Sequence, residues 1–136
     1  MRSRGLIDTN AIVAIVDAND HWHQACVDAH RGASLPLATS AAVVAEVFHL
    51  LKAHEVEPAW RFLRGGGVAV LPIGDHDLPE LERLMLKYAD RPMDFADATL
   101  VRLAEREGLT TILTVDRDFE VYRIGGRKAF RLLPKR

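Results

Sequence analysis

Residues 5–16 read GLIDTNAIVAIV, and this stretch decides the fold. Residues 5–7 suit a buried strand, and residues 11–17 (AIVAIVD) have the apolar pattern of a helix. An aspartate, Asp8, stands where the expected strand gives way to the helix. A carboxylate at such a junction can cap the helix. It can also belong to a site built from several acids, so the rest of the sequence must decide between the two roles.

The remaining sequence repeats this alternation of short apolar strands and amphipathic helices. Further strands are expected at 35–39, 68–73, 109–115 and 128–133, and further helices at 21–31, 40–54, 57–64, 77–89 and 94–107. Strands that alternate with helices at this spacing favour a parallel sheet covered on both faces. We therefore predict an α/β fold, and we expect the 136 residues to form a single domain over 1–136.

The composition excludes several classes of protein. No apolar stretch approaches the roughly 20 residues that span a bilayer, so we expect no membrane contact. The N-terminal residues MRSRGLIDTN lack the apolar core and cleavage pattern of a signal peptide. The single cysteine, Cys26, excludes an intramolecular disulfide and fits a reducing compartment. We expect a soluble, cytoplasmic protein.

Charge is distributed unevenly along the chain. The formal net charge is −1, but residues 117–136 carry +5 and the preceding 116 residues carry −6. A basic tail on an acidic body can be a footprint for a polyanion. The alternative interpretation is a solvated C-terminal strand and tail.

Four acids occupy related places in the pattern. In parallel sheets, ligands bind beyond the carboxyl ends of the strands, where the strand order reverses. Asp8 follows the first strand, and Asp116 ends the apolar run TILTV. Glu46 lies inside the apolar stretch AAVVAEVFHLL, where a carboxylate is costly unless it meets a partner. Asp97 lies one turn into the helix expected at 94–107.

Each acid also has a purely structural explanation. Asp8 can cap the first helix, and Glu46 can pair with Lys52 or an arginine. Asp97 can stabilise the start of its helix, and Asp116 can begin a turn. Together, however, they require four unrelated reasons for acids that all point toward one edge of the sheet. We therefore favour a common site.

Clustered carboxylates need a counter-charge. Two unit charges about 4 Å apart repel by about 4 kcal/mol at an effective dielectric near 20, so protons or metal ions must relieve them. An all-carboxylate site suits Mg²⁺ or Mn²⁺ rather than Zn²⁺. Such an ion polarises a phosphoryl oxygen and generates a hydroxide nucleophile. The four acids therefore predict hydrolysis of phosphodiester bonds.

Four segments carry a resemblance to a known family. They are LIDTN (6–10), SAAVVAEV (40–47), RPMDFADATLVRLAEREG (91–108) and TILTVDRDF (111–119). In this order and spacing they resemble the PIN-domain family, specifically the VapC-type toxin ribonucleases. The resemblance implies a PIN-like three-layer α/β/α sandwich around a mostly parallel sheet, and a metal-dependent endoribonuclease that acts on RNA. It also implies a VapB-like antitoxin that inhibits the toxin by inserting a segment at the active site.

The resemblance also implies roles for the acids. The catalytic and metal-binding quartet would be Asp8, Glu46, Asp97 and Asp116, holding Mg²⁺ or Mn²⁺. We expect Asp8 and Asp97 to be the most direct metal ligands. Asp94 matches a further acid, for which a capping role is also available.

Four more residues match supporting positions of the family. Thr114 matches a small hydroxyl that supports the site by hydrogen bonding. Thr9 and Asn10 match the residues after the first acid, and we expect them to order the backbone turn there. Asp118 matches the acid before an aromatic residue, and we expect it to support the site rather than bind its ligand directly.

Several alternatives remain at this stage. A phosphoacceptor receiver domain also has acids at strand ends, but it needs a lysine after a late strand, and none of the lysines here follows a central strand. A non-catalytic module that binds metal or RNA is a further alternative. The residues His23, Cys26 and His30 share one helical face, but a closed zinc site needs four ligands and no fourth is evident. The apolar residues of the helices at 21–31 and 57–64 favour a homodimer, as the resemblance also does.

Overall fold

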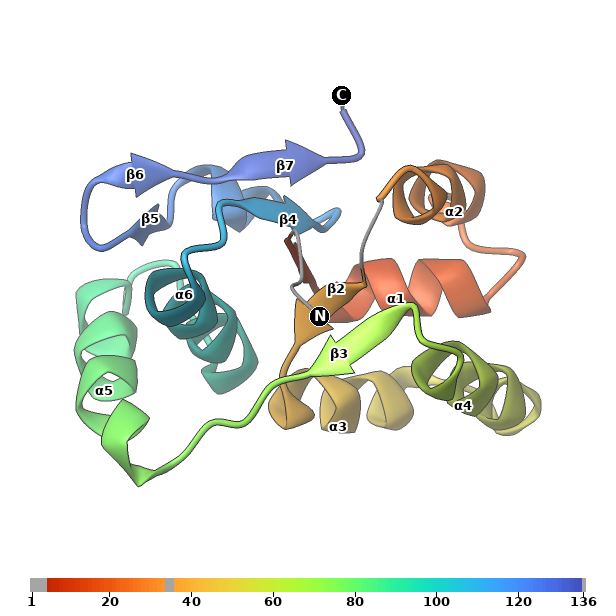
Figure 1. Ribbon diagram of the computed structural model, residues 1–136, viewed down its shortest axis with the longest axis horizontal. Coiled ribbons are helices and arrows are strands. Elements are labelled where there is room, and N and C mark those ends of the chain that lie inside the picture. Colours follow the sequence, from red (N-terminus) through yellow and green to blue (C-terminus); the bar gives the residue numbers. More distant parts are fainter. Residues whose placement is uncertain (1–4, 34–35, 136) are drawn as a thin grey trace.

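A parallel sheet forms the centre of the molecule. The computed structural model describes residues 5–33 and 36–135. In these residues the main sheet has five parallel strands in the order β3-β2-β1-β4-β7 (Figure 1). They are β1 (Leu6–Ile7), β2 (Leu37–Thr39), β3 (Val68–Val70), β4 (Thr111–Leu113) and β7 (Arg131–Leu133). A separate antiparallel hairpin joins β5 (Arg123–Ile124) to β6 (Lys128–Ala129). The predicted parallel sheet is confirmed.

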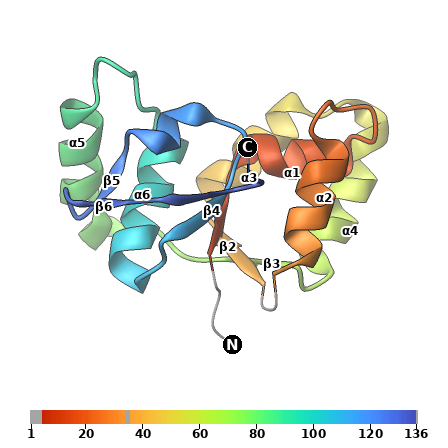
Figure 2. The same cartoon turned by 90° about the horizontal axis from the view of Figure 1, so that it is seen from above.

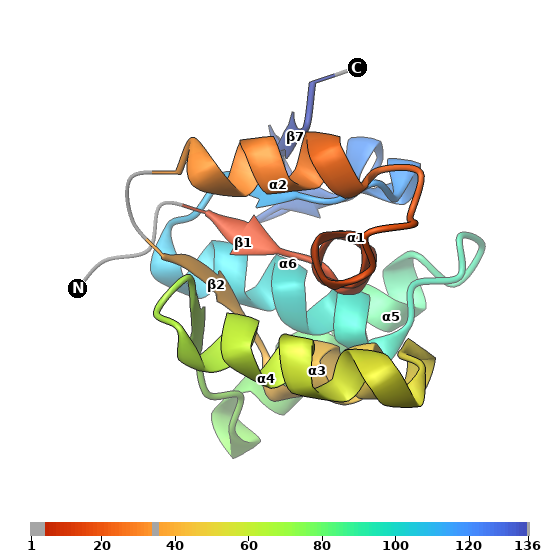
Figure 3. The same cartoon turned by 90° about the vertical axis from the view of Figure 1, so that its right-hand side faces the viewer.

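Helices cover both faces of the sheet. They are α1 (Thr9–Val16), α2 (His23–Arg31), α3 (Ala41–Leu50), α4 (Val56–Arg64), α5 (Leu78–Lys87) and α6 (Phe95–Glu107). Figure 2 shows α1 to α4 on one side of the sheet and α5 and α6 on the other, and Figure 3 shows α1 to α4 in front of the strands. The predicted three-layer arrangement is confirmed. Within the described residues, none of the helices combines the length and the apolar character needed to cross a membrane.

The strand order explains this division of the helices. The chain moves outward from β1 through β2 to β3, and then returns to β4 on the other side of β1. Because crossovers between parallel strands are right-handed, helices of the outward path lie on one face and helices of the return path lie on the other. The direction reverses between β1 and β4. Ligands of parallel sheets bind beyond the carboxyl ends of strands at such a reversal.

The neighbouring strands β1 and β4 are hydrogen-bonded to each other in parallel. Ile7 pairs with Leu113, and the Asp8 N–H donates to the Leu113 carbonyl oxygen at 3.0 Å. A Cβ atom on Gly5 would lie 2.7 Å from the carbonyl oxygen of Thr111, so only glycine fits where β1 begins. Ile7 and Leu113 are fully buried. The carboxyl ends of β1 and β4 are therefore fixed side by side.

One predicted helix ends earlier than expected. The sequence predicted a helix over 40–54, but α3 ends at Leu50, and Leu51 has an extended backbone with φ −76° and ψ 147°. The Glu55 side chain accepts a hydrogen bond from the Lys52 N–H at 2.9 Å, which starts a new helical segment. No glycine or proline stands between Leu50 and Glu55, so the local sequence did not reveal the break.

One predicted strand is divided in two. The sequence predicted a strand over 128–133, but β6 and β7 occupy its two ends and the buried Phe130 lies between them. Gly125 and Gly126 have φ of +61° and +76°, which lets β5 turn back onto β6. The predicted strand 35–39 begins outside the described residues, and β2 covers its last three positions.

Candidate metal centre

Asp8 stands at the carboxyl end of β1 and caps α1. Its Oδ1 atom accepts a hydrogen bond from the Thr9 N–H at 2.7 Å, and its Oδ2 atom accepts one from the Thr114 hydroxyl at 2.8 Å. The residue is buried, with 3% of its surface exposed. Capping and membership of a shared site, which the sequence offered as alternatives, therefore occur together at this residue.

Asp116 lies beyond the carboxyl end of β4, two residues after Thr114. It begins a short 3₁₀ helix (Arg117–Glu120), and its Oδ1 atom accepts from the Asp118 N–H at 2.9 Å. The Asp116 N–H in turn donates to the Thr114 hydroxyl oxygen at 2.9 Å. Beside it, Asn10 Oδ1 accepts from the Val115 N–H at 3.1 Å. Thr114 and Asn10, both predicted as supporting residues, thus tie the end of β4 to the start of α1.

Asp97 approaches from the opposite side, on the first turn of α6. Asp94 is the N-cap of this helix, and its Oδ1 atom accepts from the Asp97 N–H at 2.8 Å. The reciprocal bond, from the Asp94 N–H to Asp97 Oδ2, is longer at 3.4 Å. Gly108, with φ +70°, ends the helix. Asp94 therefore has a capping role, and it holds Asp97 at the helix start.

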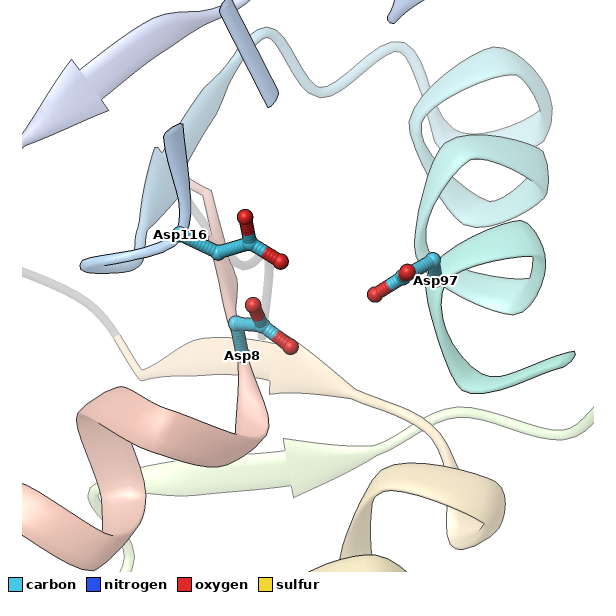
Figure 4. Close-up of side chains that lie close together, drawn as sticks. All are labelled: Asp8, Asp97 and Asp116. Atoms are coloured by element: carbon cyan, nitrogen blue, oxygen red, sulfur yellow. The ribbon is translucent and has the colours of Figure 1, made fainter. Parts of the chain in front are cut away.

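The three aspartates converge. One side-chain oxygen from each of Asp8, Asp97 and Asp116 lies within 4.8 Å of the other two. Figure 4 shows Asp8 and Asp116 extending from the adjacent strand ends toward Asp97, which faces them from α6. Glu46 is not within this group. It is half-buried on α3, and its charge acts on Asp8.

The cluster is electrostatically strained without a cation. Burial raises the pKa of Asp8 to about 7, although the hydrogen bonds from Thr114 and Thr9 oppose the shift and Asp116 adds to it. Burial and then the charge of Asp8 raise the pKa of Asp97 to about 8. Both pKa values lie far above the ordinary 3.8 of an aspartic acid. A bound cation would relieve this repulsion and favour the ionised carboxylates.

The donor set fits a hard divalent ion. The three side chains offer carboxylate oxygens and no nitrogen or sulfur, which is the preference of Mg²⁺ and Mn²⁺. Among the described residues, this trio is the one group of three or more acids, histidines or cysteines close enough to hold an ion.

The histidine and cysteine motif of α2 has a structural explanation. His23 Nδ1 lies 2.7 Å from the Ala14 carbonyl oxygen, and His30 Nε2 lies 3.1 Å from the Gly67 carbonyl oxygen. Cys26 is buried in the core. The two rings therefore tie α2 to its neighbours, in line with the absence of a fourth zinc ligand in the sequence.

Sequence reasoning missed two residues near the acids. Arg91 Nη1 lies 3.4 Å from Asp118 Oδ1, and 43% of its side chain is exposed. Arg91 belongs to the segment that carried the family resemblance, but nothing in the pattern placed it beside Asp118. The Tyr122 hydroxyl is buried, and the negative charge of Asp97 reaches it. In the sequence, Tyr122 is indistinguishable from any core aromatic residue.

Comparison with known proteins gives the family. The family model described as PIN domain matches residues 5–125. The chain belongs to the PIN-domain family. It is 35% identical over 137 residues to ribonuclease VapC26 of Mycobacterium tuberculosis, an alignment that covers 95% of this chain and 99% of the relative. The resemblance to VapC-type proteins is confirmed, and a phosphoacceptor receiver domain is excluded.

Solved structures share the PIN-domain fold of this chain. One is VapC20 of Mycobacterium tuberculosis, described as a toxin that cleaves the sarcin–ricin loop. It has a TM-score of 0.77 and 19% identity, and the match covers 85% of this chain and 92% of the other. Another is VapBC2 of Rickettsia felis bound to a DNA fragment from its promoter, with a TM-score of 0.64, 15% identity and coverage of 93% and 95%. At these identities the two likenesses concern the fold alone.

Proposed function

We propose that this protein is a metal-dependent endoribonuclease that hydrolyses RNA phosphodiester bonds and is the toxin of a type II toxin–antitoxin pair. The convergence of Asp8, Asp97 and Asp116 at the reversal of the strand order carries this proposal. Membership of the PIN-domain family and the likeness to a VapC ribonuclease support it. We also propose that the protein acts in the cytoplasm, where a cell's RNA lies.

Asp8, Asp97 and Asp116 would hold Mg²⁺ or Mn²⁺, and the nearby charge of Glu46 would add to the attraction. When bound, the cation supplies Lewis-acid polarisation and charge neutralisation for phosphodiester hydrolysis. The protein keeps the ligands in place before the cation arrives. Both oxygens of Asp8 already accept hydrogen bonds, from Thr9 and Thr114, so little reorganisation is needed.

The RNA backbone needs cations of its own beside this acidic site. Arg91 and Arg117 are exposed at the rim, with 43% and 79% of their side chains accessible. The segment 117–136 carries a net charge of +5. We propose that these basic residues bind phosphates on either side of the cleaved bond, because phosphate contacts position a nucleic acid without reading its sequence.

We propose two protein partners, a VapB-like antitoxin and a second copy of the chain. The support for the antitoxin is the likeness to a VapBC complex. The support for contacts with these protein partners is a set of exposed apolar side chains, because such side chains commonly mark interfaces. Leu50 on α3 and Trp60 on α4 are two of them. Leu78 on α5 and Phe95 on α6 are two more, on other helices. Light scattering tests the dimer, which would have twice the 15.2 kDa mass of one chain.

The toxin proposal is tested by inducing the protein in a bacterial host and sequencing RNA 5′ ends. We expect growth arrest and new 5′ ends at a small number of sites, and neither effect with Asp8→Asn at the same protein level. Metal and RNA binding without new ends in cells or in vitro would instead identify a non-catalytic binding module. Unchanged growth and unchanged 5′ ends would contradict the toxin function.

A further inference from the structure

The Tyr122 hydroxyl is buried without a hydrogen-bond partner in the described part of the chain. The side chain is fully buried, and its ring makes edge contacts with Tyr88 and Phe119, at centroid distances of 5.0 Å and 5.1 Å. Most buried hydroxyls are paired, because an unpaired one loses its bonds to water and gains none. A phenylalanine would fill the same space without this cost. The hydroxyl therefore needs an explanation beyond packing.

The surroundings of this hydroxyl are acidic. Burial and then the charges of Asp97, Asp118 and Asp116 raise the pKa of Tyr122 above its ordinary value of 10.0. The phenol therefore keeps its proton at neutral pH and remains a hydrogen-bond donor. Among these carboxylates, Asp97 has the strongest effect on it.

Asp97 is the member of the metal-binding trio whose carboxylate is held least firmly. Both Asp8 oxygens accept short hydrogen bonds, of 2.7 Å and 2.8 Å, and Asp116 Oδ1 accepts one of 2.9 Å. In the described residues the Asp97 carboxylate accepts the 3.4 Å bond from the Asp94 N–H and no shorter one. An acceptor without a short bond thus lies near a donor without a partner.

We propose that Tyr122 is a positioning residue, whose hydroxyl donates to the Asp97 carboxylate when a divalent cation occupies the cluster. The inference rests on the proposed metal site. A carboxylate has two oxygens, so one can face Asp8 and Asp116 while the other accepts from Tyr122. This bond fixes the orientation of Asp97 and satisfies the buried hydroxyl. Carboxylates that bind metals in proteins are usually held in this way, and loss of such a partner typically costs about 10–100-fold in metal affinity or activity.

Tyr122→Phe removes one oxygen and keeps the ring contacts. The matched control is Tyr88→Phe, the same change on the neighbouring ring, whose hydroxyl already accepts from the Arg123 N–H at 3.1 Å. We expect Tyr122→Phe to weaken Mn²⁺ binding, measured by calorimetry, about 10-fold and to lower kcat without changing the KM for RNA. The Tm of the metal-free variant should equal or exceed that of the wild type. Tyr88→Phe should lower Tm and leave Mn²⁺ affinity and kcat unchanged.

Wild-type Mn²⁺ affinity and kcat in Tyr122→Phe would overturn the inference and leave the proposed function intact. The inference would also be overturned if Tyr122→Phe lowered Tm as much as Tyr88→Phe does and changed Mn²⁺ affinity no more than Tyr88→Phe does. A wild-type protein that neither binds Mn²⁺ nor cleaves RNA would overturn the proposed function, and this inference with it.

Discussion

The Thr114 hydroxyl donates to Asp8 Oδ2 across 2.8 Å, and it joins two residues that are 106 positions apart in the chain. The same hydroxyl oxygen accepts from the Asp116 N–H at 2.9 Å. A hydroxyl can donate and accept at once, so this one buried side chain fixes two of the three clustered acids. The acidic cluster thus depends on a residue that carries no charge.

Two replacements of Thr114 distinguish the effect of its hydroxyl group from the effect of its side-chain volume. Thr114→Val keeps the volume and removes both bonds, and we expect RNA cleavage to fall by about 10-fold or more. Thr114→Ser keeps the hydroxyl and should retain most of the activity. Initial cleavage rates at saturating Mn²⁺ decide the matter. Equal activity of the valine variant and the wild type would show that the hydroxyl does not support the site.

The pH dependence of stability follows from the raised pKa values. Asp8 and Asp97 have pKa values of about 7 and about 8 in the folded protein, above the roughly 3.9 of an unfolded chain. The folded state therefore holds these protons more tightly, and the stability they contribute is lost as pH rises from about 4 through 8. We expect the Tm of metal-free protein to fall between pH 5 and 8, by roughly 2–8 °C per kcal/mol lost.

Two comparisons isolate the acidic cluster in this experiment. Asp97→Asn cannot ionise at this position, so its Tm should fall less steeply with pH. Mn²⁺ should restore Tm at pH 8 in the wild type, because the cation favours the ionised carboxylates. Burial also raises the pKa of Glu105 to about 7, so Glu105 adds a fall in stability that Mn²⁺ should not reverse. A wild-type Tm that rises from pH 5 to 8 in metal-free buffer would contradict the prediction.

A buried ion pair attaches α5 to α6. Asp77 has no exposed surface, and its oxygens accept from Arg102 at 2.8 Å and from Arg106 at 2.9 Å. Asp77→Ala leaves two arginines without this partner, and we expect a loss of about 3–5 kcal/mol in the free energy of unfolding. Glu57→Ala breaks an exposed pair with Arg61 and should cost at most about 1 kcal/mol. Urea unfolding of both variants tests the contrast, and equal losses would refute it.

Arg91 provides a test of RNA binding at the rim. We expect Arg91→Ala to raise the KM for RNA several-fold with kcat little changed, and to reduce the slope of log affinity against log salt by about 1. The control is Arg61→Ala on α4, which removes an exposed arginine from the opposite side of the sheet. If both variants bind RNA alike, Arg91 is not a phosphate contact.

The close approach of Asp8 and Asp116 was predictable from the sequence. Each follows a short apolar strand, and the carboxyl ends of parallel strands meet at one edge of a sheet. Asp97 was also among the acids assigned to this edge from the sequence, but its place opposite the strand ends depends on how α6 packs, which the local pattern does not show. The predicted metal role of Glu46 remains a prediction, since it lies outside the group of close oxygens.

Other features depend on long-range contacts that no local pattern records. The break after Leu50 occurs where no glycine or proline marks the end of a helix, and Glu55 accepts a hydrogen bond that begins the next segment. The hairpin of β5 and β6 depends on two glycines with positive φ, which lie before the predicted strand 128–133 and let its first two residues pair with β5. Tyr122 is a buried core residue, and its sequence context shows nothing more. That the charge of Asp97 reaches it follows from the path of the chain after β4.

The clustered aspartates are proposed to hold a cation for RNA hydrolysis. The most direct measurement is the cleavage of a pool of structured RNAs by purified protein in Mg²⁺, Mn²⁺ or EDTA. Asp8→Asn is the test variant, and Asp90→Asn makes the same chemical change at an exposed site. We predict discrete fragments that require the metal, persist with Asp90→Asn and vanish with Asp8→Asn. Cleavage that survives in EDTA or in Asp8→Asn would show that the aspartates do not hold a catalytic cation.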